Sequence, residues 1–295
     1  GENVVLVGAL LLFVAVMAGK VAYRFGAPAL LLFLGVGMLF GLNFISFRSV
    51  EMTQFVGMIA LCIILFTGGM DTSFQEIKPI IGPGVVLATV GVVMTAMVLA
   101  GFVWLVAPWL DLEISFALAL LLAATMSSTD SASVFSILRS KKQGLKQHLR
   151  PLLELESGSN DPMAYMLTIL LIGVVTNSQG GGGLGMSALY FVVQLVVGTL
   201  SGYLIGRLAV WTINKINLAN HSLYSVLLLA FIFFAFAFTD LVKGNGYLAV
   251  YLAGLVVGNH KLAQKRSLTV FFDGFTWLMQ IVMFLTLGLF VNSDE

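Results

Sequence analysis

Residues 114–138 read ISFALALLLAATMSSTDSASVFSIL, an apolar run with a polar cluster in its second half. A helix needs about 20 apolar residues to cross a membrane, and this run is long enough. Six of the seven residues 127–133 are Ser, Thr or Asp, and these side chains compete with the helix backbone for hydrogen bonds. We therefore predict a membrane helix that is discontinuous at this cluster, deep in the membrane.

Similar apolar runs fill the rest of the chain. Of its 295 residues, 59% are hydrophobic and 10% are charged, whereas soluble domains carry about 25% charged residues. The mean hydropathy is +1.01. We predict an all-α integral membrane protein with about ten transmembrane helices, because lipid cannot satisfy free backbone groups and nothing alternates like a barrel strand. The runs lie near residues 4–24, 28–46, 53–71, 80–108, 114–138, 150–175, 186–214, 222–242, 246–259 and 268–292.

The charged residues predict the topology and limit the partners. When the basic loop 139–150 is placed in the cytoplasm, as the positive-inside rule demands, 13 of the 15 Lys and Arg residues fall on that side. Only Arg48 and Lys243 fall outside, and the N-terminus lies outside as well. The net charge of +1 argues against a nucleic-acid partner. The single cysteine, Cys62, leaves no disulfide framework.

A second polar stretch lies in the sixth run and reads Glu154-Leu155-Glu156-Ser157-Gly158-Ser159-Asn160-Asp161-Pro162. Ser157 and Asp161 are four residues apart and share one helix face. An ionisable residue inside a membrane span indicates a functional site, because its burial is costly. Asp161, Asp130, Thr129 and Ser157 together would supply the oxygen ligands that a hard cation prefers.

Structural roles remain alternatives for several of these acids. Asp130 could cap the interrupted helix instead of binding an ion. Glu154 and Glu156 follow Arg150 by about one turn, near the predicted cytoplasmic surface. For Glu156, structural pairing and function are both open, whereas for Glu154 pairing is favoured. Both stay as secondary candidates for the site.

The stretches 128–135 and 154–162 resemble the two signature motifs of bacterial monovalent cation/proton antiporters of the NhaP type, and most closely those of the potassium/proton branch. Shorter matches at residues 26–28, 66–70, 254–259 and 284–289 follow in the family's order. The resemblance implies a multi-pass protein of the bacterial inner (plasma) membrane, with the lipid bilayer as its partner. It implies exchange of a monovalent cation, K⁺ or Na⁺, for H⁺, with no cofactor and no enzymatic reaction.

The resemblance also implies roles for individual residues. Asp161 would hold a cation and a proton alternately. Asn160 stands where electrogenic relatives carry a second Asp, so an electroneutral exchange is implied. Thr129, Asp130 and Ser157 match positions that line the ion site or hold crossed helices together.

The implied fold consists of inverted repeats in a homodimer whose core domain moves like an elevator. Residues 1–79 and 217–295 would belong to the dimer or scaffold domain, residues 80–176 to the ion-binding core domain, and residues 177–216 to a linker helix. The resemblance implies more helices than the ten predicted here. The chain is therefore predicted to be a fragment of the antiporter that lacks its last helices.

Three alternatives to active antiport remain open. The first is an ion channel. The second is an organic-anion transporter of similar architecture, which would need cationic or Asn-rich contacts at the midplane, and no mid-span Arg or Lys is found. The third is a transport-inactive fragment of the antiporter. An intramembrane protease is disfavoured, because the Gly-x-Gly-Asp pattern expected around its aspartates is missing.

Overall fold

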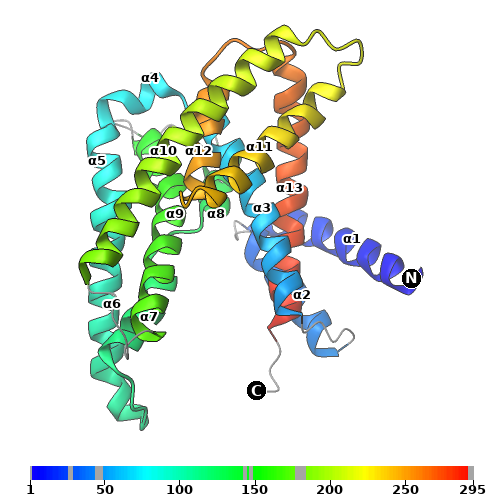
Figure 1. The fold of residues 1–295 in the computed structure, drawn as a ribbon. Helices are drawn as coiled ribbons and strands as arrows, with labels where there is room; N and C mark the ends of the chain where they lie inside the picture. Colours follow the sequence, from blue (N-terminus) through cyan, green and yellow to red (C-terminus); the bar gives the residue numbers. More distant parts are fainter. Residues whose placement is uncertain are drawn as a thin grey trace. The chain divides into compact units, whose positions relative to one another are not determined.

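The chain is all-helical in the computed structural model, which describes residues 2–25, 29–43, 49–141, 145, 149–176 and 184–291 and shows no strand within them. Figure 1 shows the helices coloured along the chain. They fall into two compact units, Gly1–Ile64 with Arg266–Glu295, and Leu65–Lys265.

The first unit contains a very close contact between two helices. Its elements are α1 (Glu2–Phe25), α2 (Ala29–Asn43), most of α3 (Val50–Asp71) and nearly all of α13 (Lys265–Phe290). A Cβ atom on Gly37 would lie 2.5 Å from the backbone oxygen of Leu285, and one on Gly288 would lie 2.3 Å from that of Leu34. Glycine therefore lets the backbones of α2 and α13 touch, as small residues do between membrane helices.

The second unit holds the longest helical run and the interrupted helix. The run Phe74–Leu110 consists of α4 (Phe74–Ile77), a 3₁₀ turn, α5 (Ile81–Val86), a π-helical turn, α6 (Val92–Val106) and a second 3₁₀ turn. The helices that follow are α7 (Phe116–Thr125), α8 (Ser131–Lys141), α9 (Leu149–Thr176), α10 (Leu184–Lys215), α11 (Leu223–Leu241) and α12 (Gly246–Gly258). Helix α12 packs along α10 and α11, while α7 packs along α6 and α9.

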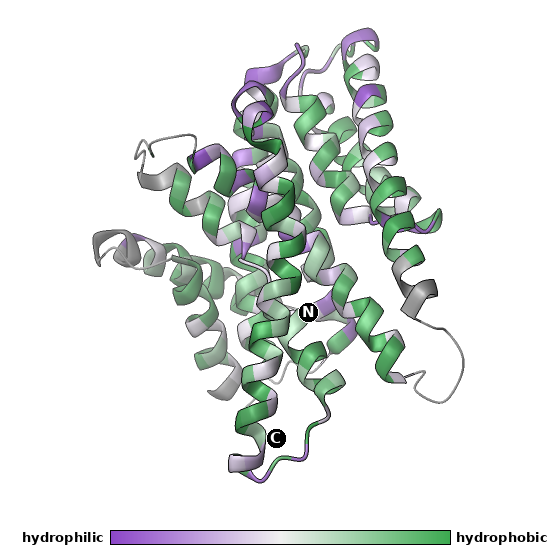
Figure 2. Cartoon of the chain, turned by 90° about the vertical axis from the view of Figure 1, so that its left-hand side faces the viewer, coloured by the Kyte–Doolittle hydropathy of each residue, from purple (hydrophilic) through white to green (hydrophobic). Residues whose placement is uncertain are grey.

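Six helices within the described residues are long and apolar enough to cross a membrane, as a multi-pass membrane protein requires. Figure 2 shows hydrophobic residues along most of their length. Four shorter apolar helices have 10–17 residues. Each of the ten predicted runs therefore contains an apolar helix, while the count of ten spans stays a prediction. The six are Val50–Asp71, Phe74–Leu110, Leu149–Thr176, Leu189–Lys215, Leu223–Leu241 and Lys265–Phe290, and the four are Val5–Lys20, Ala29–Gly41, Phe116–Thr125 and Gly246–Gly258.

The helix predicted over residues 114–138 is interrupted, but the interruption ends earlier than predicted. The chain leaves the helix between α7 and α8, at residues 126–130, rather than throughout 127–133. Asp130 explains the early return to helix. Its Oδ2 accepts hydrogen bonds from the backbone N–H of Ser133, at 3.1 Å, and from the Ser133 hydroxyl. This is the bonding of a helix N-cap, which satisfies a free donor in the first turn of α8.

Helix α12 touches the last turns of α3 through glycine. A Cβ atom on Gly254 would lie 2.2 Å from the backbone oxygen of Phe66. One on Gly258, a turn later, would lie 1.9 Å from that of Met70. No side chain fits at either position, so the two glycines allow this close packing.

Candidate ion-binding site

The interruption between α7 and α8 faces the first half of α9, and polar side chains from both segments meet there. The Ser128 hydroxyl lies at the centre of this contact. Its Oγ is 2.5 Å from Oδ1 of Asp161, 2.9 Å from Oδ1 of Asn160 and 3.1 Å from the backbone oxygen of Thr129. Because residues 126–130 are not helical, the side chains of Ser128 and Thr129 are free to bond to a neighbouring helix or an ion.

Asn160 joins the remaining polar groups to this contact. Its side chain is 1% exposed. Its Nδ2 donates to Oγ1 of Thr129 at 2.7 Å and to Oε1 of Glu156 at 2.8 Å. Thr129 Oγ1 in turn donates to Oγ of the fully buried Ser157 at 3.4 Å. Both amide hydrogens of Asn160 are used, so its oxygen is held toward Ser128.

Five of the predicted site residues therefore lie together: Asp161, Asn160, Thr129, Ser157 and Glu156. Their role in ion binding stays a prediction.

The other two predicted residues have structural partners. Asp130 is exposed and caps α8 through Ser133, although its charge is near enough to act on Asp161. Oε1 of Glu154 accepts a hydrogen bond from Nε of Arg150 at 2.9 Å, which is the pairing that the sequence favours.

Ser128 is the cluster residue that the sequence prediction missed. Ser127 and Ser128 are adjacent and chemically identical, but they have different partners. Oγ of Ser127 donates back to the backbone oxygen of Ala124 at 2.8 Å and closes the end of α7. Of these two serines, Ser128 is the one that bonds to α9. The one signal in the sequence was its place directly before Thr129, inside the predicted interruption.

Helix α12 fixes the segment of α9 that carries the site. A Cβ atom on Gly158 would lie 2.4 Å from Cε2 of Tyr251, whose side chain is completely buried. The amide of Asn245, at the start of α12, donates from Nδ2 to the backbone oxygen of Pro162 at 3.1 Å. Pro162 lies inside α9 and does not end it. These contacts flank Asp161 in the sequence and hold its helix in place.

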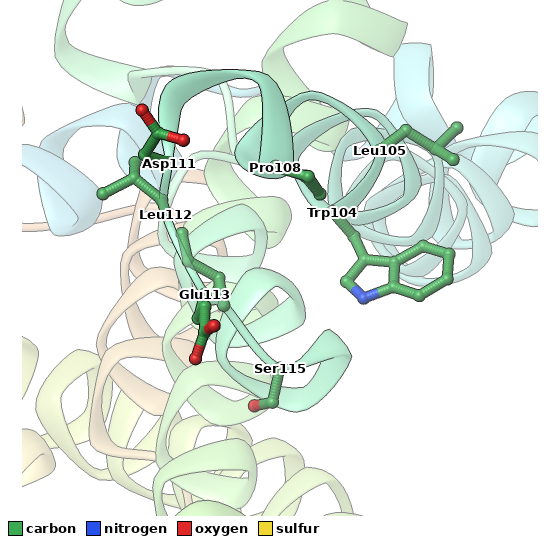
Figure 3. Close-up of a pocket in the computed structure, with 8 residues that line it drawn as sticks. Trp104, Leu105, Pro108, Asp111, Leu112, Glu113 and Ser115 are labelled. Atoms are coloured by element: carbon green, nitrogen blue, oxygen red, sulfur yellow. The ribbon is translucent and has the colours of Figure 1, made fainter.

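A pocket of about 640 Å³ lies at the turn between α6 and α7, at the opposite end of α7 from the cluster. It contains the carboxylates of Asp111 and Glu113, but Figure 3 shows that they point in different directions. Ser115 is already used, because its Oγ accepts a hydrogen bond from the Leu118 N–H at 3.2 Å. The pocket offers no converging ligands and is not the candidate site.

The cluster at Ser128 offers oxygen atoms from a carboxylate, hydroxyls, an amide and a backbone carbonyl. Such ligands suit hard cations, whereas transition metals are commonly bound by imidazole and thiolate. Within the described residues, no group of three or more His, Cys, Asp and Glu side chains is placed to hold a metal ion. Oxygen ligands at an interrupted helix among apolar helices are the arrangement of ion-binding membrane transporters.

Comparison with known proteins identifies the family. The sequence matches the family described as sodium/hydrogen exchanger, transmembrane, over residues 9–294, and the chain belongs to this family. It is 42% identical over 295 residues to the K(+)/H(+) antiporter NhaP of Alkalimonas amylolytica, covering 99% of the chain and 50% of that protein. It is 36% identical over 293 residues to the K(+)/H(+) antiporter NhaP2 of Shewanella sp. (strain ANA-3), covering 98% of the chain and 50% of that protein.

These relatives confirm the resemblance to NhaP-type antiporters, and the chain spans about half of their length. The fold is also similar to that of the sodium proton antiporter MjNhaP1 from Methanocaldococcus jannaschii at pH 8. The TM-score is 0.81 at 21% identity, and the match covers 100% of this chain and 72% of that one. At this identity the match supports the fold alone.

Proposed function

We propose that this protein, at full length, exchanges a monovalent cation for H⁺ across the membrane by competition of the two ions for Asp161. The observation that carries this proposal is the position of Asp161, hydrogen-bonded to Ser128 in the interruption and next to Asn160 on α9. The K(+)/H(+) antiporters among its relatives support the same function.

A single carboxylate is sufficient for such an exchange. Protonation removes the negative charge that a cation needs, and a bound cation favours the charged form of the carboxyl group. The two ions therefore exclude each other at Asp161. When the site is exposed to the two sides of the membrane in turn, entry of one ion on one side is coupled to release of the other.

The transported cation is K⁺ or Na⁺. Relatives named as K(+)/H(+) antiporters support K⁺, and the solved structure of similar fold is a sodium proton antiporter. Flux of K⁺, Na⁺ and Li⁺ in proteoliposomes with a pH gradient tests the function. Antiport predicts that cation entry drives proton exit, whereas a channel would pass the cation without this coupling.

The architecture that we propose has ten spans, an N-terminus outside the inner membrane and a homodimer. Residues 80–176 would form the core that moves by an elevator-like step, residues 177–216 the linker helix, and residues 1–79 and 217–295 the scaffold. Asp161, Asn160, Thr129 and Ser157 would line the cation site, with Glu156 tied to it through Asn160. Asp130 would hold the interrupted helix through Ser133 and act on the site through its charge.

The topology can be tested by cysteine labelling in intact cells. The native Cys62 is buried and is replaced by Ala as background. A cysteine at Gln143, in the basic loop, should stay unlabelled by a membrane-impermeant maleimide until the cells are opened, because positive loops remain in the cytoplasm. A cysteine at Gly181, in the next loop, should label from outside. Labelling of the Gln143 position in intact cells would refute the topology.

The stoichiometry can be tested by flux under a clamped membrane voltage. Asn160 contributes no charge, so one proton should exchange for one monovalent cation and no net charge should move. We expect the exchange rate in liposomes to be insensitive to voltages set with an ionophore, since moving one charge through 100 mV is worth about 2.3 kcal/mol. Asn160→Asp serves as the comparison, because its added carboxylate could bring in a second charge. A strong voltage dependence of the wild-type protein would exclude electroneutral exchange.

A further inference from the structure

We propose that Ser128 and Ser131, from the interruption and the first turn of α8, are direct ligands of the transported cation and set which cation is preferred. This inference rests on the proposed exchange at Asp161. It adds two hydroxyl groups to the site. It also gives a specific role to Ser128, which the sequence prediction had not included in the site.

The Ser128 hydroxyl has more acceptors around it than it can satisfy. It carries one hydrogen, but three oxygens lie within 3.1 Å of its Oγ: those of Asp161, Asn160 and the Thr129 backbone. With Asp161 ionised, one oxygen can receive the hydrogen, while the other two face Oγ with their lone pairs. These facing lone pairs repel one another. A cation placed among the oxygens would remove the repulsion, because each oxygen could then coordinate it.

Ser131 provides a second and independent sign of a ligand. Its side chain is 0% exposed, yet its Oγ makes no hydrogen bond within the described part of the chain. It lies beside the Asp161 carboxyl group, toward which both its hydroxyl and its backbone N–H are directed. Buried hydroxyl groups are normally hydrogen-bonded, and an exception calls for an explanation such as an ion. A cation beside Asp161 would supply the missing partner.

The charge of this ligand set matches a monovalent ion. In the proposed ligand set one carboxylate, from Asp161, faces neutral oxygens from Ser128, Ser131, Asn160 and the Thr129 backbone, while the carboxylates of Glu156 and Asp130 are not ligands. Because selectivity depends on the number and field strength of the oxygen ligands, each neutral hydroxyl favours a larger ion that needs more ligands. Loss of one hydroxyl should therefore weaken K⁺ more than Li⁺.

The test uses the full-length protein and measures proton release on addition of K⁺, Na⁺ or Li⁺. Ser128→Ala and Ser131→Ala should each lower the ratio of K⁺ to Li⁺ affinity by about threefold or more. Ser128→Thr keeps the hydroxyl and should restore the wild-type ratio. Ser128→Cys keeps nearly the same shape, but its thiol is a poor ligand for hard cations. It should therefore lower the ratio of K⁺ to Li⁺ affinity even if the Ala variants do not fold.

The matched control is Thr168→Val. The Thr168 hydroxyl also lies on α9, but among the described residues it bonds to the Ala164 backbone oxygen alone, at 2.8 Å, so its loss should leave the ratio unchanged. If the Ser128 and Ser131 variants that fold keep the wild-type ratios, the two hydroxyls are not ligands, while the exchange function stands. If the wild-type protein releases no proton with any of the three cations, the exchange function itself fails.

Discussion

Asp161→Asn in the full-length protein should abolish proton release on addition of K⁺ or Na⁺ while the helical fold is retained. The amide keeps the shape of the carboxyl group and its contact with Ser128, but it has no charge for a cation and no proton to exchange. The measurement is calorimetry, or a pH-sensitive dye, on purified protein titrated with cation. Circular dichroism and size-exclusion chromatography confirm that the variant is folded.

Two further variants make this result specific. Asp240→Asn removes an exposed carboxylate on α11 and should leave proton release unchanged. Asp161→Glu keeps the charge on a longer side chain and should retain part of the signal with a shifted pH dependence. If Asp161→Asn released protons like the wild type, the assignment would be wrong, and Asp130 would become the leading candidate.

The second large effect should come from packing rather than from charge. Gly254→Ala should destabilise the protein by about 2 kcal/mol or more, because overpacking forces the backbone to shift. Its new methyl group would lie 2.2 Å from the backbone oxygen of Phe66 on α3, and neither helix has a side chain there that can move aside. The apparent Tm in detergent should fall.

The same substitution at Gly173 is the matched control. Gly173 lies on α9, and apart from the adjacent backbone of α9 no described atom lies within 4 Å of the place that an added methyl group would take. Ala should therefore keep or raise the Tm. The free energy of unfolding should rise by at most about 0.5–1 kcal/mol, the usual difference between Gly and Ala inside a helix. Equal Tm values for the Gly254 and Gly173 variants would show that α3 and α12 do not touch as described.

The apolar helices could be predicted from sequence because lipid leaves the backbone few choices. Each apolar run had to hydrogen-bond within itself, and each contains a helix. The run predicted from residue 80 begins at Phe74, since polar residues such as Glu76 and Lys78 continue the helical run beyond its apolar part. Hydropathy marks where lipid begins, which is not where a helix begins.

The site was predictable in its residue types but not in its pairings. The acids stood out because charge is rare in apolar runs. Both Asp130 and Asp161 were candidates by that rule, and for Asp130 a role as helix cap was left open. In the structure Asp130 bonds to Ser133 three residues away, while Asp161 accepts a hydrogen bond from Ser128 in another segment. The choice between Ser127 and Ser128 depends on the direction in which the chain turns after α7. That direction results from tertiary packing, which local spacing does not encode.

The Asn245 amide has a consequence for the kinetics of any movement of α9 along α12. Its Nδ2 bonds to the backbone oxygen of Pro162, and its side chain is only 2% exposed. Sliding α9 past α12 removes this acceptor before water can replace it, and an unmatched buried donor costs about 1–3 kcal/mol. Each 1.4 kcal/mol slows a step about tenfold. If α9 moves along α12, this one bond would therefore slow the step and lengthen the time that α9 spends in the position described here.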